Sequence, residues 1–149
     1  MDLKLKDKVV VVTGGGGAIG SAIAKSFAAE GAKVVVTGRT VATLEAIVNE
    51  IKAEGGHAAA ITCDVSSKES CEELVNKTVE QFGSLDVLVN NAGIIKRQDS
   101  IEFSEENWDS VIAVNLKTVF FLTQAVAKQY IKQGSGGKII NIASMLSYQ

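Results

Sequence analysis

The clearest chemistry in this sequence of 149 residues lies in a glycine-rich turn that follows an apolar run. Residues 13–20 have the sequence TGGGGAIG, and residues 9–12 before them are all valine. Because glycine has no Cβ, a phosphate group can approach the backbone N–H groups of such a turn. A helix that begins at the turn adds unpaired N–H groups and the positive end of its dipole. The pattern indicates a nucleotide phosphate site, and a turn without a ligand is the alternative.

Two glycine spacings overlap in this turn. Gly15, Gly17 and Gly20 fit the pattern G-x-G-x-x-G, and Gly14, Gly17 and Gly20 fit a variant of it. A strand before the turn and a helix after it are the context in which this pattern binds a dinucleotide. The residues assigned to cofactor binding are Gly14, Gly15, Gly16, Gly17, Ile19 and Gly20.

Two polar side chains next to apolar segments are further candidates. Asp64 directly follows an apolar run, so it either contacts a ligand or caps the next turn. Asn115 lies among apolar residues of a long helical stretch. An amide is costly to bury unless it is paired, so Asn115 is either a functional group or a satisfied core amide.

These residues are positioned by a chain in which β-branched runs alternate with amphipathic segments. Runs at 9–13, 33–37, 58–63, 85–90 and 138–143 predict five strands with helices between them. Ser66 and Glu69 predict a capping box at the start of the third helix. In the first helix, Ile19, Ile23 and Phe27 predict the face that packs on the sheet.

The predicted fold class is α/β, with a doubly wound parallel sheet and helices on both faces, in one domain over residues 1–149. Sheets of this kind bind ligands at the carboxyl ends of their strands. The candidate residues above all fall at one of those ends.

Composition favours a cytoplasmic protein that binds neither nucleic acid nor a membrane. The formal net charge is −2, no apolar run predicts a membrane span, and residues 1–8 lack the apolar core of a signal peptide. Cys63 and Cys71 are too few for a disulfide framework, so we expect reduced thiols in the core. No metal site is predicted.

Five separated motifs resemble those of the short-chain dehydrogenase/reductase family. They are the glycine turn, CDV at 63–65, NNAG at 90–93, Asn115 in the segment AVNL, and INIAS at 140–144. The resemblance runs from about residue 5 to residue 149 and is to the compact, single-domain branch, although Ala18 stands where that branch usually has glycine. It implies a Rossmann fold and an NAD(P)-dependent oxidoreductase that moves a hydride between the nicotinamide and a secondary alcohol or ketone.

The resemblance also implies contacts to the cofactor outside the glycine turn. Asp64 would accept a hydrogen bond from the adenine amino group, and Val65 would pack on the ring. Asn91, Ala92 and Gly93 would border the cofactor, while Asn90 is as much a scaffolding residue as a functional one.

For catalysis, the resemblance implies that Ser144 hydrogen-bonds the substrate oxygen and that Asn115 holds a water in a proton relay. The family's Tyr-x-x-x-Lys pair, which supplies the general acid and base, belongs farther along than Gln149, the last residue. We therefore expect a chain truncated after the fifth strand and inactive on its own. A catalytically silent nucleotide-binding module is the alternative.

The end of the second predicted strand bears on the choice of cofactor. NAD-dependent members of the family generally have an acidic residue where this sequence has Gly38, followed here by Arg39. A guanidinium can pair with a 2′-phosphate, which favours NADP. NAD remains possible, because Arg39 can also be an ordinary exposed charge over the adenine.

The segments 94–97 and 143–149 resemble sugar-acid dehydrogenases of the family, such as 2-deoxy-D-gluconate 3-dehydrogenase and gluconate 5-dehydrogenase. Lys96 and Arg97 can pair with the carboxylate of such a small-molecule substrate, or they are solvated surface charges. A 3-oxoacyl carrier-protein reductase is the alternative activity.

The same resemblance implies a homo-oligomer, a dimer or a tetramer, formed through the long helix. In a chain that ends at Gln149, we expect part of that helix to lack cover, including Val119, Phe120, Val126 and Tyr130. Such an apolar patch favours association with another copy or with a C-terminal remainder of the same protein.

Overall fold

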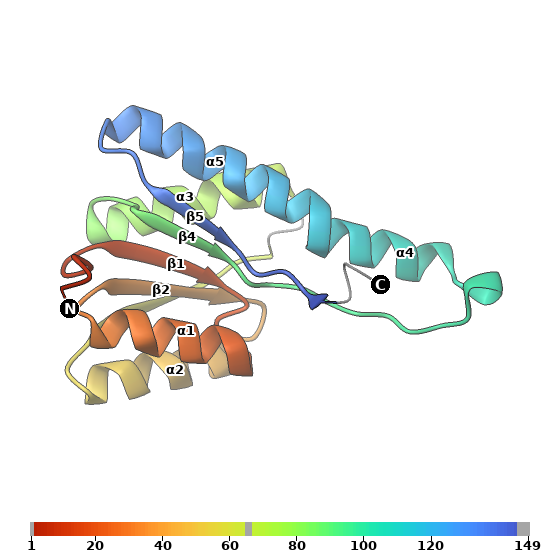
Figure 1. The fold of residues 1–149 in the computed structure, drawn as a ribbon, viewed down its shortest axis with the longest axis horizontal. Coiled ribbons are helices and arrows are strands. Elements are labelled where there is room, and N and C mark those ends of the chain that lie inside the picture. Colours follow the sequence, from red (N-terminus) through yellow and green to blue (C-terminus); the bar gives the residue numbers. More distant parts are fainter. Residues whose placement is uncertain (1, 65–66, 146–149) are drawn as a thin grey trace.

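The computed structural model describes residues 2–64 and 67–145, which form one parallel sheet between two layers of helices (Figure 1). Every strand pair is parallel, and the strand order is β3-β2-β1-β4-β5. The strands are β1 (Val9–Thr13), β2 (Lys33–Gly38), β3 (His57–Thr62), β4 (Val87–Asn90) and β5 (Lys138–Asn141). The predicted fold class is confirmed.

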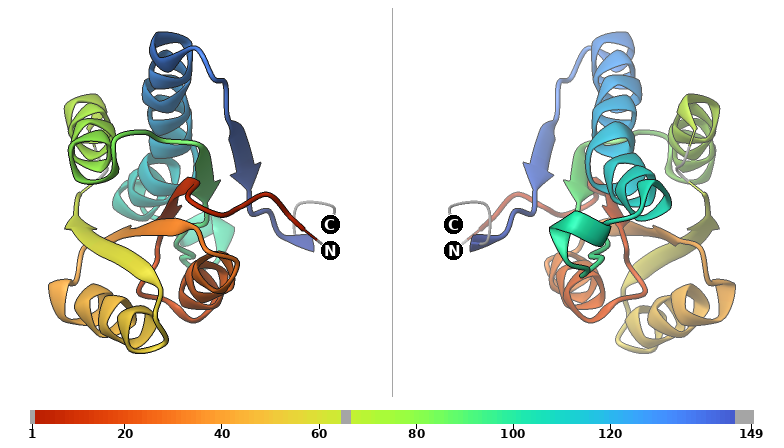
Figure 2. Two further views of the ribbon diagram at one scale, coloured as in Figure 1. Left: turned by 90° about the vertical axis from the view of Figure 1, so that its left-hand side faces the viewer. Right: turned by 90° about the vertical axis from the view of Figure 1, so that its right-hand side faces the viewer.

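The helices divide between the two faces of the sheet, as the two end-on views of Figure 2 show. Helices α1 (Ala18–Ala29) and α2 (Val41–Ala53) cover one face, and α3 (Lys68–Phe82) and α5 (Thr118–Gln133) cover the other. Before α5 come the 3₁₀ turn η1 (Ser100–Glu102), α4 (Glu105–Ile112) and the π-helical turn η2 (Ala113–Lys117).

The central strand β1 explains why the sheet is buried on both faces. Its four valines are β-branched, which favours extended backbone, and each is at most 1% exposed. Val10 and Val12 pack with α1 and α2, while Val11 points to the opposite face and packs with α3 and α5. Because helices pack on both faces of β1, residues 9–12 are all apolar, and the sequence does not alternate between apolar and polar residues.

The face that α1 turns to the sheet agrees only in part with the predicted one. Ile19 is 64% exposed, and Ile23 and Phe27 are only partly buried against the core. Residues with small or no side chains face the sheet instead, so the helix backbone lies close to the strands. The buried residues of α1 are Gly20, Ala24 and Ala28.

The predicted capping box is displaced by one residue. Ser67 is the N-cap of α3: its hydroxyl accepts a hydrogen bond from the Ser70 backbone N–H at 3.1 Å, and Ser70 Oγ accepts one from Ser67 N–H at 3.3 Å. Serine thus takes the part that the prediction gave to Glu69. Ser66 lies outside the described residues.

The strands end within two residues of the predicted bounds. The largest differences are at the start of β4, which begins at Val87 instead of Leu85, and at the end of β5, which ends at Asn141 instead of Ala143. Asp86, just before β4, uses its side chain instead: its carboxylate accepts a hydrogen bond from Val9 N–H at 2.9 Å. That contact ties the segment before β4 to the start of β1.

The segments α4, η2 and α5 form a continuous helix of 29 residues, Glu105–Gln133, seen in Figure 1. By length and composition alone it could cross a membrane, so the expectation that no apolar stretch reaches that length is not met. Part of its apolar character serves the core, since Leu122 and Val126 are completely buried against the sheet.

The predicted uncovered patch on this helix is partly wrong. Val126 and Tyr130 are buried, with exposed fractions of 0% and 9%, because they face α3 and the sheet. Phe120 is 61% exposed, as expected, and Val119 is partly buried.

Candidate functional site

The predicted motifs converge on a cavity of about 190 Å³ at the carboxyl ends of the strands. Segments from β1, β2, β3 and β4 and from the helix after β4 contribute to its wall. The lining residues are Thr13, Gly14, Thr37, Gly38, Arg39, Cys63, Asp64, Ala92, Gly93, Ile94, Val114 and Thr118. Five predicted cofactor residues are among them: Gly14, Arg39, Asp64, Ala92 and Gly93.

The glycine turn next to this cavity has a shape that side chains would prevent. Gly14 has φ +63°, and a Cβ on Gly20 would overlap the Gly14 carbonyl oxygen. A Cβ on Gly15 would lie 2.7 Å from Val36 Cβ, so the turn fits closely over β2. At Gly17, in contrast, a Cβ would meet only the Gly14 carbonyl oxygen, at 3.5 Å. A Cβ on Gly16 would lie 2.6 Å from Thr43 Oγ1, whereas Gly17 leaves open space before α1.

The N-terminus of α1 fits an anionic group. Its N-cap, Gly17, provides no side-chain hydrogen bond, and the first turn contains no acidic residue. Helices α3 and α4 differ, because the hydroxyls of Ser67 and Ser104 cap them. The free N–H groups and dipole of α1 are therefore not compensated by the chain's own side chains.

Thr13 links the glycine turn to the segment after β4. Its hydroxyl oxygen accepts hydrogen bonds from Asn91 N–H at 3.0 Å and Ala92 N–H at 2.9 Å, and donates one to Val89 O at 3.3 Å. The Asn91 amide donates to Thr13 O at 3.1 Å. Asn91 and Ala92 are thus held beside Gly14 by contacts within the protein, and Asn91 itself does not line the cavity.

Asn90 has a scaffolding position. Its side-chain amide donates to Asn141 Oδ1 at 2.9 Å and to Thr123 Oγ1 at 3.2 Å, and the residue is 5% exposed. These bonds connect the end of β4 to β5 and to α5. The Asn90 side chain is therefore a tie between elements of the sheet.

Asn115 is exposed instead of buried among apolar side chains, so that part of the prediction is wrong. Its side chain makes a reciprocal pair with Ile94: Oδ1 accepts from Ile94 N–H and Nδ2 donates to Ile94 O, both at 2.9 Å. Asn115 lies in the π-helical turn η2, a rare geometry that is frequent at functional sites. The amide thus fixes the backbone next to Gly93 at the cavity.

Arg39 and Asp64 approach the cavity from the ends of the neighbouring strands β2 and β3. Both side chains are exposed. Cys63, next to Asp64, also lines the cavity and is only half-buried, so of the two thiols expected in the core only Cys71 is fully buried. Burial, and after it the Glu73 carboxylate, raises the pKa of the Cys63 thiol. Val65, the predicted adenine contact, lies outside the described residues.

The predicted catalytic and substrate residues lie outside the cavity wall. Ser144 is exposed and follows the end of β5, and Asn115 does not line the cavity but hydrogen-bonds Ile94, which does. Lys96 and Arg97 are exposed in the extended segment before η1. Residues 146–149, which belong to a predicted motif, are outside the described part of the chain.

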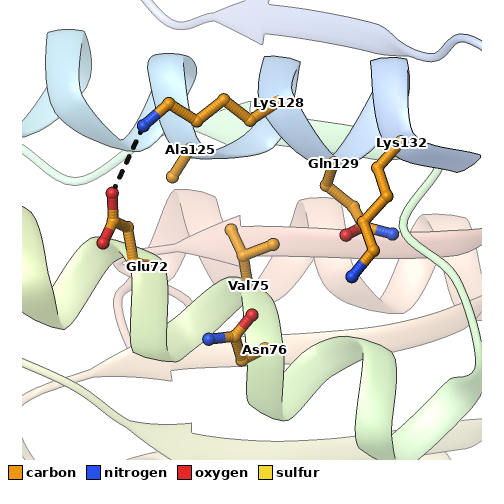
Figure 3. Close-up of a pocket in the computed structure, with 7 residues that line it drawn as sticks. All are labelled: Glu72, Val75, Asn76, Ala125, Lys128, Gln129 and Lys132. Carbon is orange, nitrogen blue, oxygen red and sulfur yellow. Dashed lines mark hydrogen bonds and ion pairs between the residues drawn. The ribbon is translucent and has the colours of Figure 1, made fainter.

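A second cavity, of about 230 Å³, lies between α3 and α5 and contains none of the predicted site residues (Figure 3). Val75 and Ala125 form its apolar floor, and Glu72 pairs with Lys128 across it at 3.4 Å. These contacts join the two helices that cover one face of the sheet.

Sequence reasoning missed several residues of the cavity wall. Thr37 and Thr118 line it but lie in no motif, and Ile94 and Val114 line it but are not predicted site residues, although they lie in the segments 94–97 and AVNL. Thr37 follows three valines and resembles another β-branched core residue. Its place at the carboxyl end of β2 is the signal that could have identified it. No group of three or more potential metal ligands lies together in residues 2–64 and 67–145.

A comparison with protein families matches residues 8–149 to the family model described as short chain dehydrogenase. The chain is 47% identical over 145 residues to the 2-dehydro-3-deoxy-D-gluconate 5-dehydrogenase of Dickeya dadantii, covering 97% of this chain and 56% of that protein. It is 38% identical over 144 residues to a 3-oxoacyl-(acyl-carrier-protein) reductase of Thermotoga maritima, covering 97% and 58%. The chain thus spans little more than half the length of these curated relatives.

Among solved structures, the fold resembles that of a metagenomic short-chain oxidoreductase in complex with NADP. The TM-score is 0.89 at 39% sequence identity, and the match covers 95% of this chain and 64% of that one.

Proposed function

Because the chain belongs to the short-chain dehydrogenase/reductase family, we propose that it is the dinucleotide-binding part of an oxidoreductase. The reaction is hydride transfer between NAD(P) and a secondary alcohol or ketone. The observation that carries the proposal is the convergence of Gly14, Arg39, Asp64, Ala92 and Gly93 on one cavity at the carboxyl ends of the strands. We propose that residues 1–149 form one domain and that the protein is cytoplasmic.

The residues present fit a dinucleotide. The uncapped N-terminus of α1 and the open space at Gly17 suit a pyrophosphate. Asp64 suits the amino group of adenine, which donates hydrogen bonds. The nicotinamide ring, when the cofactor is bound, would accept or donate the hydride.

Arg39 supports a preference for NADP. The strand β2 ends at Gly38 without a carboxylate, so nothing at that position repels a 2′-phosphate, and the exposed guanidinium beside the cavity can pair with one. The solved relative that binds NADP is consistent with this preference, and NAD remains the second candidate.

Ser144 and Asn115 are the proposed catalytic residues of this chain. Ser144 Oγ would donate a hydrogen bond to the substrate oxygen and stabilise charge that develops there. The Asn115 side chain is already paired with the Ile94 backbone, so a relay water would be held by the backbone of the π-helical turn.

A sugar acid is the proposed substrate class. The relative from Dickeya dadantii is named for a sugar acid, and Lys96 and Arg97 are exposed cations that can pair with a carboxylate. The relative from Thermotoga maritima supports 3-oxoacyl reduction as the second candidate. A nucleotide-binding module without catalysis is the third, since the cavity is lined by predicted cofactor residues and not by Ser144 or Asn115.

Fluorescence titration of the purified protein with NADPH tests the core of the proposal. We expect saturable binding, and we expect Asp64→Ala to weaken it about tenfold to a hundredfold, the usual effect of losing a hydrogen bond to a charged group. Glu80→Ala, which removes an exposed carboxylate from α3, is the matched control and should leave the affinity unchanged. A protein that binds neither NADPH nor NADH would contradict the proposal.

A further inference from the structure

The hydroxyl of Thr37 is unusual in the core of this fold. Thr37 is 1% exposed, and within residues 2–64 and 67–145 its Oγ1 is the one buried side-chain oxygen or nitrogen without a hydrogen-bond partner. A buried hydroxyl that makes no hydrogen bond costs free energy, and native proteins contain few of them.

Other buried threonines of the described chain are paired. Thr78 Oγ1 and Thr118 Oγ1 each donate to a helix carbonyl oxygen at 2.8 Å, and Thr13 Oγ1 bonds to three backbone groups. The fold therefore offers partners to buried hydroxyls elsewhere. Valine, which fills the three preceding positions of β2, would give Thr37 the same branched shape without an unpaired group.

The position of Thr37 relates this unpaired group to the cavity. Side chains of a strand alternate between faces, so Thr37 points to the same face as Val35, which packs against α3 and α5. Val114 and Thr118, from the helical layer on that face, line the cavity together with Thr37. Rotation of χ1 between staggered positions exchanges the hydroxyl and the methyl group, which lets the hydroxyl meet a group placed in the cavity.

We infer that Thr37 is a specificity residue whose hydroxyl hydrogen-bonds the base of the bound dinucleotide. This inference rests on the proposed function. The Asp64 carboxylate at the same cavity suits the amino group of the base, because a carboxylate only accepts hydrogen bonds. The ring nitrogens of adenine are acceptors, so the Thr37 O–H donates to one of them.

The inference predicts opposite effects on the ligand-free and ligand-bound protein. Thr37→Val removes the unpaired hydroxyl and should raise the Tm of the ligand-free protein by about 2–4 °C. The same substitution should weaken binding of NADP⁺ about threefold to tenfold, because a hydrogen bond to the base is lost. Thr37→Ser keeps the hydroxyl but loses a methyl group, so it should lower the Tm and retain the affinity.

Calorimetric titration of the wild-type protein and both variants with NADP⁺ and with ADP tests whether the Thr37 hydroxyl contacts the base. ADP contains the base but no nicotinamide, and Thr37→Val should weaken its binding by the same factor. Equal affinity of wild type and Thr37→Val, or a lower Tm for ligand-free Thr37→Val, would overturn the inference while the proposed function stands. A wild-type protein that binds no dinucleotide would overturn both.

Discussion

At the scale of single residues, the site depends on polar groups that hold backbone in place. One hydroxyl, Thr13 Oγ1, serves two N–H groups and one carbonyl of the segment around the end of β4. The Asn115 amide does the same for Ile94. Because these groups are satisfied within the protein, the segment 91–94 is fixed before a ligand arrives, which lowers the entropy cost of binding.

The charge at Arg39 gives the first prediction. We expect wild-type protein to bind NADPH more tightly than NADH, because the guanidinium can form a charge-assisted pair with the 2′-phosphate. Arg39→Ala should reduce the difference in binding free energy between NADPH and NADH by about 1.5–3 kcal/mol, which is roughly tenfold to a hundredfold in affinity.

Titrations with both coenzymes measure this gap, and Arg97→Ala is the control, since Arg97 is exposed but does not line the cavity. Equal affinities of the wild-type protein for the two coenzymes would rule out the NADP preference.

How far the sequence predicts the site differs from residue to residue. Gly14, Arg39 and Asp64 are predicted to lie together because each lies within two residues of the end of a predicted strand, and all three line the cavity. Thr37 could not be distinguished from a core valine, since the sequence does not show which buried oxygen lacks a partner. The exposure of Asn115 depends on the π-helical turn, which hydrophobic periodicity does not reveal.

At the scale of elements, the turn η2 connects the cavity to the long helix. Asn115→Ala should release the Ile94 backbone, because both hydrogen bonds to it are lost. We expect faster hydrogen exchange at Ile94 N–H, weaker NADPH binding and only a small change in Tm, since the pair is exposed. Asn76→Ala, at an exposed position on α3, is the control. Unchanged exchange at Ile94 would show that other contacts hold this segment.

Tyr130 joins α5 to the amino-terminal ends of two strands. Its hydroxyl is 3.1 Å from Asp86 O and 2.9 Å from Lys138 O, and a Cβ on Gly137 would overlap its ring. Burial, followed by the Asp86 carboxylate, raises the pKa of Tyr130 to about 12. The hydroxyl therefore stays protonated in the folded protein at pH values where an unfolded tyrosine ionises.

This geometry predicts a pH-dependent effect of Tyr130→Phe. The variant should lose about 1 kcal/mol of stability at pH 8, because a buried hydrogen bond is removed. In the wild-type protein, the contribution of Tyr130 is complete below pH 10 and is lost as the pH rises from 10 to about 12, since only the unfolded state releases the proton. Urea denaturation should show the two proteins converging over that range. A constant difference would contradict the raised pKa.

Sequence periodicity predicts the order and type of the helices and strands, but it does not always predict which face of a helix packs on the sheet. Five strands and the helices between them are where the β-branched runs and the amphipathic segments predict them. In α1 the predicted Ile19 is exposed, because Gly20, Ala24 and Ala28 allow a closer approach to the sheet than Ile19 does. Hydrophobicity alone favours the larger side chain, whereas close packing here favours the smaller ones.

At the scale of the whole molecule, the long helix leaves large apolar side chains uncovered in the described chain. Trp108, Leu116 and Phe120 are each about 60% exposed on this helix, and Ile131 is 82% exposed. Exposed apolar surface of this extent is typical of interaction sites. Together with the family's habit of forming dimers and tetramers, it leads us to expect association of copies through this helix.

Sedimentation at micromolar concentration checks this expectation. The wild-type protein should sediment as a dimer or tetramer, and Phe120→Asp should shift it to smaller species by placing a charge in the contact. Val41→Asp, at a half-exposed position on α2, is the matched control and should not change the assembly. A monomer whose Tm is independent of concentration would rule out association through this face.

The strand order has a kinetic consequence. β1 pairs with β2 across the single helix α1, but it pairs with β4 only across a long intervening segment that contains two other strands. Loop-closure entropy therefore favours assembly of β1, β2 and β3 before β4 docks, and such high contact order slows folding. The glycine turn belongs to the early part, whereas Ala92 and Gly93 arrive with β4. The dinucleotide site is therefore complete only late in folding, after β4 has docked. A bound dinucleotide would then slow unfolding more than it would speed refolding.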